Sequence, residues 1–261
     1  VGAHAGGMMV LHRKSGYIEY YNRHNSNLPS NNIYSIISDG YGGLWVASLE
    51  YLLHFDIDKR NFTIVDVDED GHKLQQYNRL LFCDSKKRIW AGGEMGISVF
   101  NQVGTSLLPN TDFQIASVLK QAFVNCFYET SSGYLWIGTR NGLFALKESD
   151  KQFLQYTTEN GLPSNVIYGI LEDAYGRLWI STNQGLSCLN PESGKFRNFT
   201  IMDGLQGNQF NAGAYCRKDN GYMLFGGVNG ITSFRPETLI DNPYAPKPVI
   251  NKLFVHNKEV L

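Results

Sequence analysis

The chain has 261 residues, and its 23 basic and 24 acidic side chains give a formal net charge of −1. Such a balance offers no cationic surface for phosphates, so it argues against nucleic acid as a partner of this region. A hydrophobic content of 43%, an aromatic content of 13% and 27 glycines exclude a disordered chain and indicate a turn-rich β protein.

Residues 1–21 are expected to form the closing half of a repeat unit. Within them, VGAHAGG matches the segment that follows a tryptophan in later units, and YIEYYN matches a closing strand. Because the chain begins midway through a unit, we expect a truncated part of a larger ring with about six or seven blades.

The repeat is marked by four tryptophans. They are separated by 45, 46 and 43 residues and stand at Trp45, Trp90, Trp136 and Trp179. A further 45 residues lead to Leu224 in GYMLFGGVNGI. Glycine often precedes the anchor by three residues and aspartate by six, which predicts a tight turn. A glycine six residues after the anchor predicts a second turn, which must differ in the first unit because Tyr51 takes that place.

Four short strands are predicted in each unit, and in the best-defined unit they span 166–172, 177–181, 186–190 and 196–200. Four strands at a period of 43–46 residues are typical of a β-propeller blade, so we assign five propeller repeats to residues 22–240 of an all-β fold. The tryptophans recur at one phase in every unit. We therefore interpret them as packing wedges between blades rather than as sugar-stacking rings.

Residues 241–261 differ from the repeats in composition and pattern. Half of the eight prolines fall between positions 236 and 248, which indicates a stiff linker. The segment VINKLFVHNKEVL then alternates as the first strand of a further β domain would.

The four cysteines form no CxxC pair. Each lies in a predicted strand, where a free thiol behaves as a small buried hydrophobe, although one disulfide remains an alternative. They are Cys83, Cys126, Cys188 and Cys216.

Several segments resemble a known repeat family. NGLPSN at 160–165, followed by Asp173, Gly176 and LWI at 178–180, resembles the two-component-regulator propeller repeat. DGLQGNQFNAGAY at 203–215 and FGGVNGITSFRPE at 225–237 resemble the last blade of the periplasmic sensor region of Bacteroides-type hybrid two-component systems. KPVINKLFVHNKEV resembles the start of that family's three-tyrosine immunoglobulin-like sandwich.

This resemblance implies a receptor ectodomain on the periplasmic face of the inner membrane, anchored by a membrane helix outside this chain. In that family the ectodomain senses oligosaccharides, and a cytoplasmic histidine kinase controls glycan-utilisation genes. The implied partners are an oligosaccharide, the adjoining propeller and sandwich domains, and a second copy in a receptor homodimer. Composition by itself leaves a cytosolic protein open, because no window approaches the roughly 18 apolar residues of a membrane span.

No motif of a catalytic, metal or cofactor site is present. The chain lacks GxSxG, HExxH, P-loop and GxGxxG patterns, and its six histidines are scattered. We therefore predict no enzyme activity, no metal and no cofactor for this region. A histidine or tyrosine paired with arginine at the central mouth of the ring would instead favour a further hypothesis, a propeller lyase.

Ligand contacts are expected where the copies differ. Because strands alternate in direction, the loop before the first strand and the loop between the second and third strands share one face of the ring. Amide and guanidinium groups on that face suit the hydroxyls of a sugar, although asparagine also simply makes turns. The candidate ligand-binding residues are Glu50, Tyr51, Glu94, Arg140, Asn141, Asn183, Gln184, Asn208, Gln209, Asn211 and Asn229.

The competing function is a protein-interaction or dimerisation platform that binds no small ligand. That reading predicts an exposed apolar or charged patch.

Overall fold

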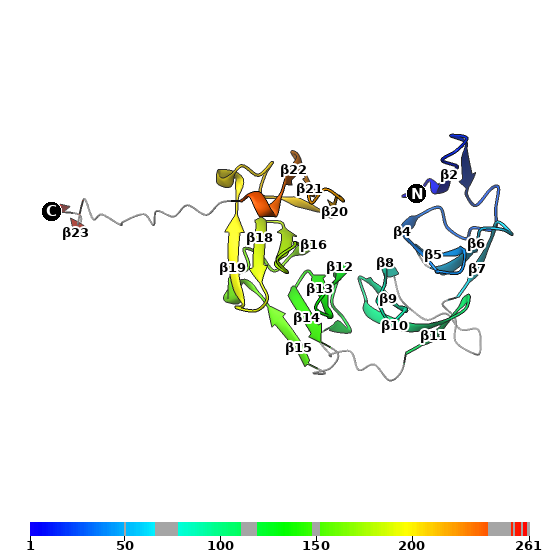
Figure 1. The fold of residues 1–261 in the computed structure, drawn as a ribbon, viewed down its shortest axis with the longest axis horizontal. Helices are drawn as coiled ribbons and strands as arrows, with labels where there is room; N and C mark the ends of the chain where they lie inside the picture. The colour runs from blue at the N-terminus through cyan, green and yellow to red at the C-terminus, as the bar shows by residue number, and fades with distance from the viewer. Residues whose placement is uncertain are drawn as a thin grey trace.

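The computed structural model describes residues 1–49, 51–65, 78–110, 119–147 and 152–239, together with 252, 254–256 and 258–259. Six antiparallel sheets of three or four strands follow one another around an open arc (Figure 1). The first and last of these sheets form the two ends of the arc. The all-β propeller architecture predicted from the repeat is confirmed.

Within each sheet the strands pair in chain order. The first sheet contains β1 (Gly2–Ala3), β2 (Gly7–Leu11) and β3 (Ile18–Tyr21). Four complete blades follow: β4 (Ile33–Ser38), β5 (Gly43–Ser48), β6 (Leu52–Asp56) and β7 (Asn61–Ile64); β8 (Asn78–Cys83), β9 (Arg88–Gly93), β10 (Gly96–Val103) and β11 (Ser106–Pro109); β12 (Val124–Glu129), β13 (Tyr134–Thr139), β14 (Gly142–Lys147) and β15 (Gln152–Tyr156); β16 (Ile167–Glu172), β17 (Leu178–Thr182), β18 (Gly185–Asn190) and β19 (Lys195–Phe199).

The last sheet contains β20 (Phe210–Arg217), β21 (Met223–Gly227) and β22 (Gly230–Phe234). Among the elements that lie wholly in described residues, the 3-10 helices are η3 (Thr158–Asn160), η4 (Ile201–Asp203) and η5 (Pro236–Thr238), which lie between or after blades. The predicted fourth strand of this repeat is absent from the described residues, because η5 follows β22 directly. Proline at the first position of η5 has no N–H for a sheet ladder.

The strands of the best-defined unit were predicted correctly. β16–β19 begin and end within one residue of the expected ranges. Apolar runs bounded by glycine, asparagine and proline therefore locate these strands well, since the punctuating residues set the turns.

The tryptophans pack between blades, as predicted. All four are at most 2% exposed. Trp90 belongs to a cluster with Val124, Phe127 and Ile137 of the next sheet. Trp136 joins Ile167 and Ile180 in the same way. In the described residues, each core cluster thus lies between two neighbouring sheets and not within a single blade.

The turn between the first two strands is held by its aspartate. Asp173 Oδ1 accepts hydrogen bonds from the backbone N–H groups of Tyr175 and Arg177, at 2.9 and 3.0 Å. The glycine three residues before the tryptophan adopts the left-handed conformation, with φ of 74° at Gly176. Lys87, which replaces this glycine in one unit, adopts the same conformation with φ of 64°. The turn therefore imposes this left-handed conformation even on Lys87, although residues with a side chain disfavour it.

The second turn has a left-handed glycine in later units, with φ of 121° at Gly142 and 112° at Gly185. In the first unit this turn includes Glu50, which lies outside the described residues, so the expected difference at Tyr51 stays a prediction.

All four cysteines are free thiols. Cys126 and Cys188 are buried, as predicted, and Cys83 is half-buried. The expectation was wrong for Cys216, which is exposed on β20. Its strand belongs to the sheet at the end of the arc, which has a neighbouring blade on one face only (Figure 1).

The described residues near the C-terminus form a small hairpin of β23 (Phe254–Val255) and β24 (Lys258–Glu259). Residues 240–251 lie outside the described part of the chain. The assignment of 241–261 to a linker and a sandwich strand therefore stays a prediction. In the part of the chain that the structure describes, no helix is long and apolar enough to cross a membrane.

Candidate functional site

The two sets of loops predicted to share a face lie together. The Gly142 N–H donates to the Asn165 carbonyl of the next blade at 2.8 Å. The Gly185 N–H donates likewise to the Asn208 carbonyl at 2.6 Å. A strand-connecting turn of one blade is thus fastened to the leading loop of the following blade, which makes this loop face a continuous surface.

The asparagines of the leading loops have structural roles. Asn165 Oδ1 accepts from the Thr158 N–H, and Asn208 Oδ1 accepts from the Ile201 N–H, both at 2.8 Å. Asn31 Oδ1 accepts from the Arg23 N–H at 2.9 Å. The sequence left open whether Asn208 binds a ligand or makes a turn. Its contacts are those of a turn-making residue.

A β-bulge recurs where the first strand of each complete blade leaves the loop face. The register shifts at Tyr34, Arg79, Asn125 and Tyr168. These strands, β4, β8, β12 and β16, line the inside of the arc (Figure 1). Bulges re-aim side chains and are common beside functional sites. We name these four half-buried residues the bulge ring.

The bulge ring carries tyrosine in two blades, arginine in one and asparagine in one, on a repeated backbone feature. In the last sheet, pairing is interrupted over a longer stretch, between Phe210 and Tyr215. The predicted ligand residue Asn211 lies in this interruption and is exposed. The innermost strands therefore differ in side-chain chemistry from copy to copy.

A polar cluster surrounds Arg79. Its Nη2 forms an ion pair with Glu94 Oε1 at 2.6 Å, and its guanidinium carbon lies 5.0 Å from the ring centre of Tyr34. The His4 ring contacts Tyr34 edge-on, with centroids 6.2 Å apart. Arg79 Nε is buried and has no hydrogen-bond partner among the described residues. The cluster thus offers an unused directional donor beside an aromatic face.

The remaining predicted residues are scattered over the loop face. Arg140 stacks on Phe123, with its guanidinium carbon 3.6 Å from the ring centre. Tyr51 is half-buried against the apolar cluster shared by the first two sheets. Asn183 Oδ1 is buried and has no hydrogen-bond partner in the part of the chain that the structure describes. Exposed side chains are found at Asn141, Gln184, Gln209 and Asn229, and Glu50 lies outside the described residues.

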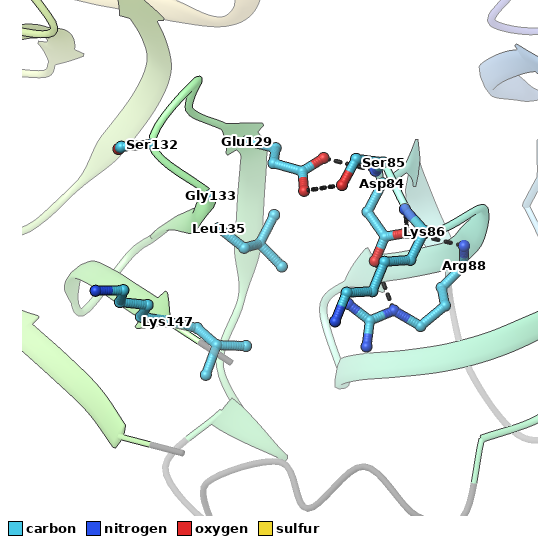
Figure 2. Close-up of a pocket in the computed structure, with 10 residues that line it drawn as sticks. Asp84, Ser85, Lys86, Arg88, Glu129, Ser132, Gly133, Leu135 and Lys147 are labelled. Carbon is cyan, nitrogen blue, oxygen red and sulfur yellow. Dashed lines mark hydrogen bonds and ion pairs between the residues drawn. The ribbon is translucent and has the colours of Figure 1, made fainter. Parts of the chain in front are cut away.

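A cavity between two blades lies on the face opposite the loop face. It has a volume of about 290 Å³ and separates β8–β11 from β12–β15. Figure 2 shows Glu129 reaching across this boundary to Ser85, whose N–H and hydroxyl donate at 2.7 and 2.6 Å. Lys86 and Arg88 lie on one side of the cavity and Lys147 on the other. Sequence reasoning did not anticipate this cavity.

Sequence reasoning also missed the bulge ring, although a signal existed. Its members stand 11 residues before the tryptophan in every unit. The side chain at that position varies from tyrosine to arginine to asparagine, which is the pattern expected of a recognition position on a repeated scaffold.

Comparison with a protein-family model identifies the repeats. The matched residues are 27–50, 119–141 and 161–184. These three segments match the two-component-regulator propeller repeat. Each matched segment of this propeller runs from a leading loop through the tryptophan strand to the following turn, so the matches cover the elements that build the loop face.

The propeller is similar to known proteins over most of its length. It is 28% identical over 216 residues to "Histidine kinase P4" of Formosa agariphila, covering 80% of this chain but 16% of that protein. A crystal structure described as the extracellular domain of a hybrid two-component system, BT3049 from B. thetaiotaomicron, matches with a TM-score of 0.72, 23% identity, and coverage of 90% and 33%. The chain thus spans a small part of the proteins it matches.

A virginiamycin B lyase from Staphylococcus aureus matches with a TM-score of 0.64 and 14% identity, covering 88% of this chain and 73% of that one. Such likenesses show the propeller fold alone. Because an enzyme and receptor ectodomains share it, function has to be argued from the site.

Proposed function

We propose that this region is the extracytoplasmic ligand-sensing part of a hybrid histidine kinase receptor that recognises an oligosaccharide and controls glycan-utilisation genes. The repeat family and the relative named as a histidine kinase support the receptor. The observation that carries the ligand site is the bulge ring, in which one backbone feature places Tyr34, Arg79, Asn125 and Tyr168 on the strands that line the inside of the arc.

The chemistry of this site suits a sugar. Tyr34 provides an aromatic face, and Arg79 and Glu94 provide donors and acceptors beside it. Sites of mostly apolar lining with a few placed polar groups are typical of small-ligand recognition. Bound sugar would shift the receptor toward one state only through its different affinity for the two states. Adjoining domains and a second receptor copy would transmit that shift.

The test is binding of defined oligosaccharides to this protein, followed by thermal unfolding. A ligand at about 100 times its Kd adds roughly 2.7 kcal/mol to the free energy of unfolding. Arg79→Ala is expected to weaken binding about tenfold, because a charge-assisted hydrogen bond is lost. Arg60→Ala is the matched control, since it removes an ion pair with Glu19 far from the bulge ring. If no bound glycan changed the phosphorylation level of the full receptor, the sensor role would be refuted.

A second candidate function is a propeller lyase, favoured by the pairing of Tyr34 with Arg79 at the loop-face end of the innermost strands. The contact places the guanidinium over the Tyr34 ring, and Glu94 occupies one edge of that guanidinium. Appearance of unsaturated sugar ends during incubation with a bound polysaccharide, abolished in Tyr34→Phe, would favour the lyase over the sensor.

A further inference from the structure

Trp136 differs from the other three tryptophans in its indole N–H. Trp90 and Trp179 donate to Asp84 and Asp173, each at 2.9 Å. Trp45 donates to Gln102 Oε1 at 3.2 Å. Trp136 Nε1 is buried and has no hydrogen-bond partner among the described residues.

The cause is a single change in the repeat. Thr130 stands where Asp84 and Asp173 stand, six residues before the tryptophan. Its hydroxyl is used within the turn, accepting from the Tyr134 N–H at 3.1 Å and lying 3.0 Å from Ser132 Oγ. A buried donor without a partner is costly and rare in native proteins, so it calls for an acceptor from elsewhere.

A cavity of about 350 Å³ adjoins this tryptophan, between β12–β15 and β16–β19. Trp136, Tyr134 and Tyr156 line it together with Ser131 and Ser132 of the Thr130 turn. In the blades of Trp90 and Trp179 the indole N–H points at the residue corresponding to Thr130. By the same geometry, Trp136 Nε1 points toward the turn that forms one wall of the cavity.

The other walls define what fits. The rings of Trp136 and Tyr156 are stacked with centroids 5.9 Å apart, and exposed Tyr175 lies at the rim. Two carboxylates, Glu172 and Glu192, also line the cavity and disfavour an anionic occupant. The volume is near the lower end of the roughly 300–1,000 Å³ of small-molecule sites, which suits a single ring rather than a chain.

We propose that this inter-blade cavity binds one neutral sugar ring, an oxygen of which accepts the hydrogen bond of Trp136 Nε1. The apolar face of the ring packs on the tyrosines, and its hydroxyls meet the serine and carboxylate oxygens. The choice of a sugar rests on the proposed sensor function, whereas the cavity and its unpaired donor do not. The site is separate from the bulge ring and lies on the opposite face of the arc.

The neighbouring cavity provides an internal contrast. It occupies the corresponding boundary between β8–β11 and β12–β15, but there Trp90 Nε1 is already bound to Asp84. Three basic side chains, Lys86, Arg88 and Lys147, line it instead of aromatic rings (Figure 2). The inference therefore applies to one boundary only.

Nitrogen-15 NMR tests the site directly, because the chain has four tryptophans and thus four indole N–H signals. Trp136→Phe identifies the signal concerned. Titration with glucose, galactose, mannose, xylose and N-acetylglucosamine is expected to move the Trp136 signal for at least one sugar, whereas glucuronate leaves it in place.

Two variants separate the cavity from a general effect. Thr130→Asp supplies the missing carboxylate and is expected to move the Trp136 signal permanently and abolish its response to sugar. Tyr175→Ala is expected to weaken the response about tenfold through loss of an aromatic contact. Tyr41→Ala is the matched control, since Tyr41 occupies the same position of an earlier turn and is similarly exposed, 70% against 67%.

The outcomes distinguish this site from the sensor function. Oligosaccharides that bind through Arg79 while no sugar moves the Trp136 signal would overturn the cavity proposal and leave the sensor intact. A Trp136 signal that responds to sugar, in a receptor whose phosphorylation responds to none, would support the cavity and overturn the sensor. If no sugar moves the signal and none binds elsewhere, both proposals are wrong.

Discussion

Asp173 Oδ2 accepts the indole hydrogen bond of Trp179 at 2.9 Å, and the same carboxylate group organises the turn that leads into the tryptophan strand. Asp173 Oδ2 also accepts from Arg177 Nε at 2.7 Å. One buried side chain therefore links a turn, a packing wedge between blades and a charged group.

The first prediction concerns that link. Asp173→Ala is expected to lower the free energy of unfolding by about 3 kcal/mol, because it leaves the Trp179 N–H and two turn N–H groups without their acceptor. Thr130→Ala is the matched control, since Thr130 holds a turn but does not bind its tryptophan. It is expected to cost about 1 kcal/mol. Equal losses in urea unfolding would contradict the role given to the indole bond.

The second prediction concerns pH. Burial by itself would raise the pKa of Asp39, but hydrogen bonds from His54 and from the Tyr41 and Gly43 N–H groups outweigh it and hold the pKa below its usual 3.8. A pKa lowered by folding contributes stability that is present above the unfolded value and is lost as the pH falls through the folded value. Asp39→Asn is therefore expected to flatten the loss of stability below about pH 4. Identical acid-unfolding slopes in the two proteins would rule this out.

Asn208 gives a third prediction, which separates a structural from a ligand role. Asn208→Ala is expected to lower the free energy of unfolding by about 1 kcal/mol, because the Ile201 N–H loses its acceptor. Asn211→Ala, in the exposed interruption of β20, is expected to leave stability within about 0.5 kcal/mol of the parent. Thermal unfolding of both variants decides the matter. A destabilised Asn211 variant beside an unaffected Asn208 variant would reverse the assignment.

The fourth prediction concerns two glycines with positive φ. A Cβ at Gly185 would lie 2.3 Å from the Phe199 carbonyl oxygen, whereas one at Gly176 would meet nothing within 4 Å. Gly176→Ala therefore carries only the cost of its conformation, about 1 kcal/mol. Gly185→Ala adds a backbone clash and is expected to cost at least about twice as much. Comparable unfolding midpoints would show that the backbone at Gly185 yields easily.

A fifth prediction follows from the free thiols. Burial raises the pKa of the Cys126 thiol to about 12, so its reactive thiolate is scarce in the folded protein. Cys216 is exposed. At mildly alkaline pH, Cys216 is expected to react with a thiol reagent while Cys126 stays protected until the chain unfolds. Mass spectrometry of the labelled peptides gives the order, and early labelling of Cys126 would contradict its burial.

The repeat, the strands and the packing role of the tryptophans could be predicted from the sequence, because each depends on the pattern of residues close together in the chain. Turn residues at fixed offsets set the strand ends, and a large apolar side chain at one phase has to be buried in every copy. The exposed thiol of Cys216 escaped this reasoning, because an apolar strand is buried only where a neighbouring sheet covers it.

Only the tertiary structure decided which residues meet. The bulge that presents Arg79, the use of Asn208 inside a turn, and the unpaired N–H of Trp136 all depend on how backbone hydrogen bonds shift or how distant groups approach. Thr130 was visible in the sequence as a departure from aspartate, yet its consequence was not. The loss of the aspartate acceptor creates a candidate binding site only because packing buries the Trp136 N–H and leaves a cavity beside it.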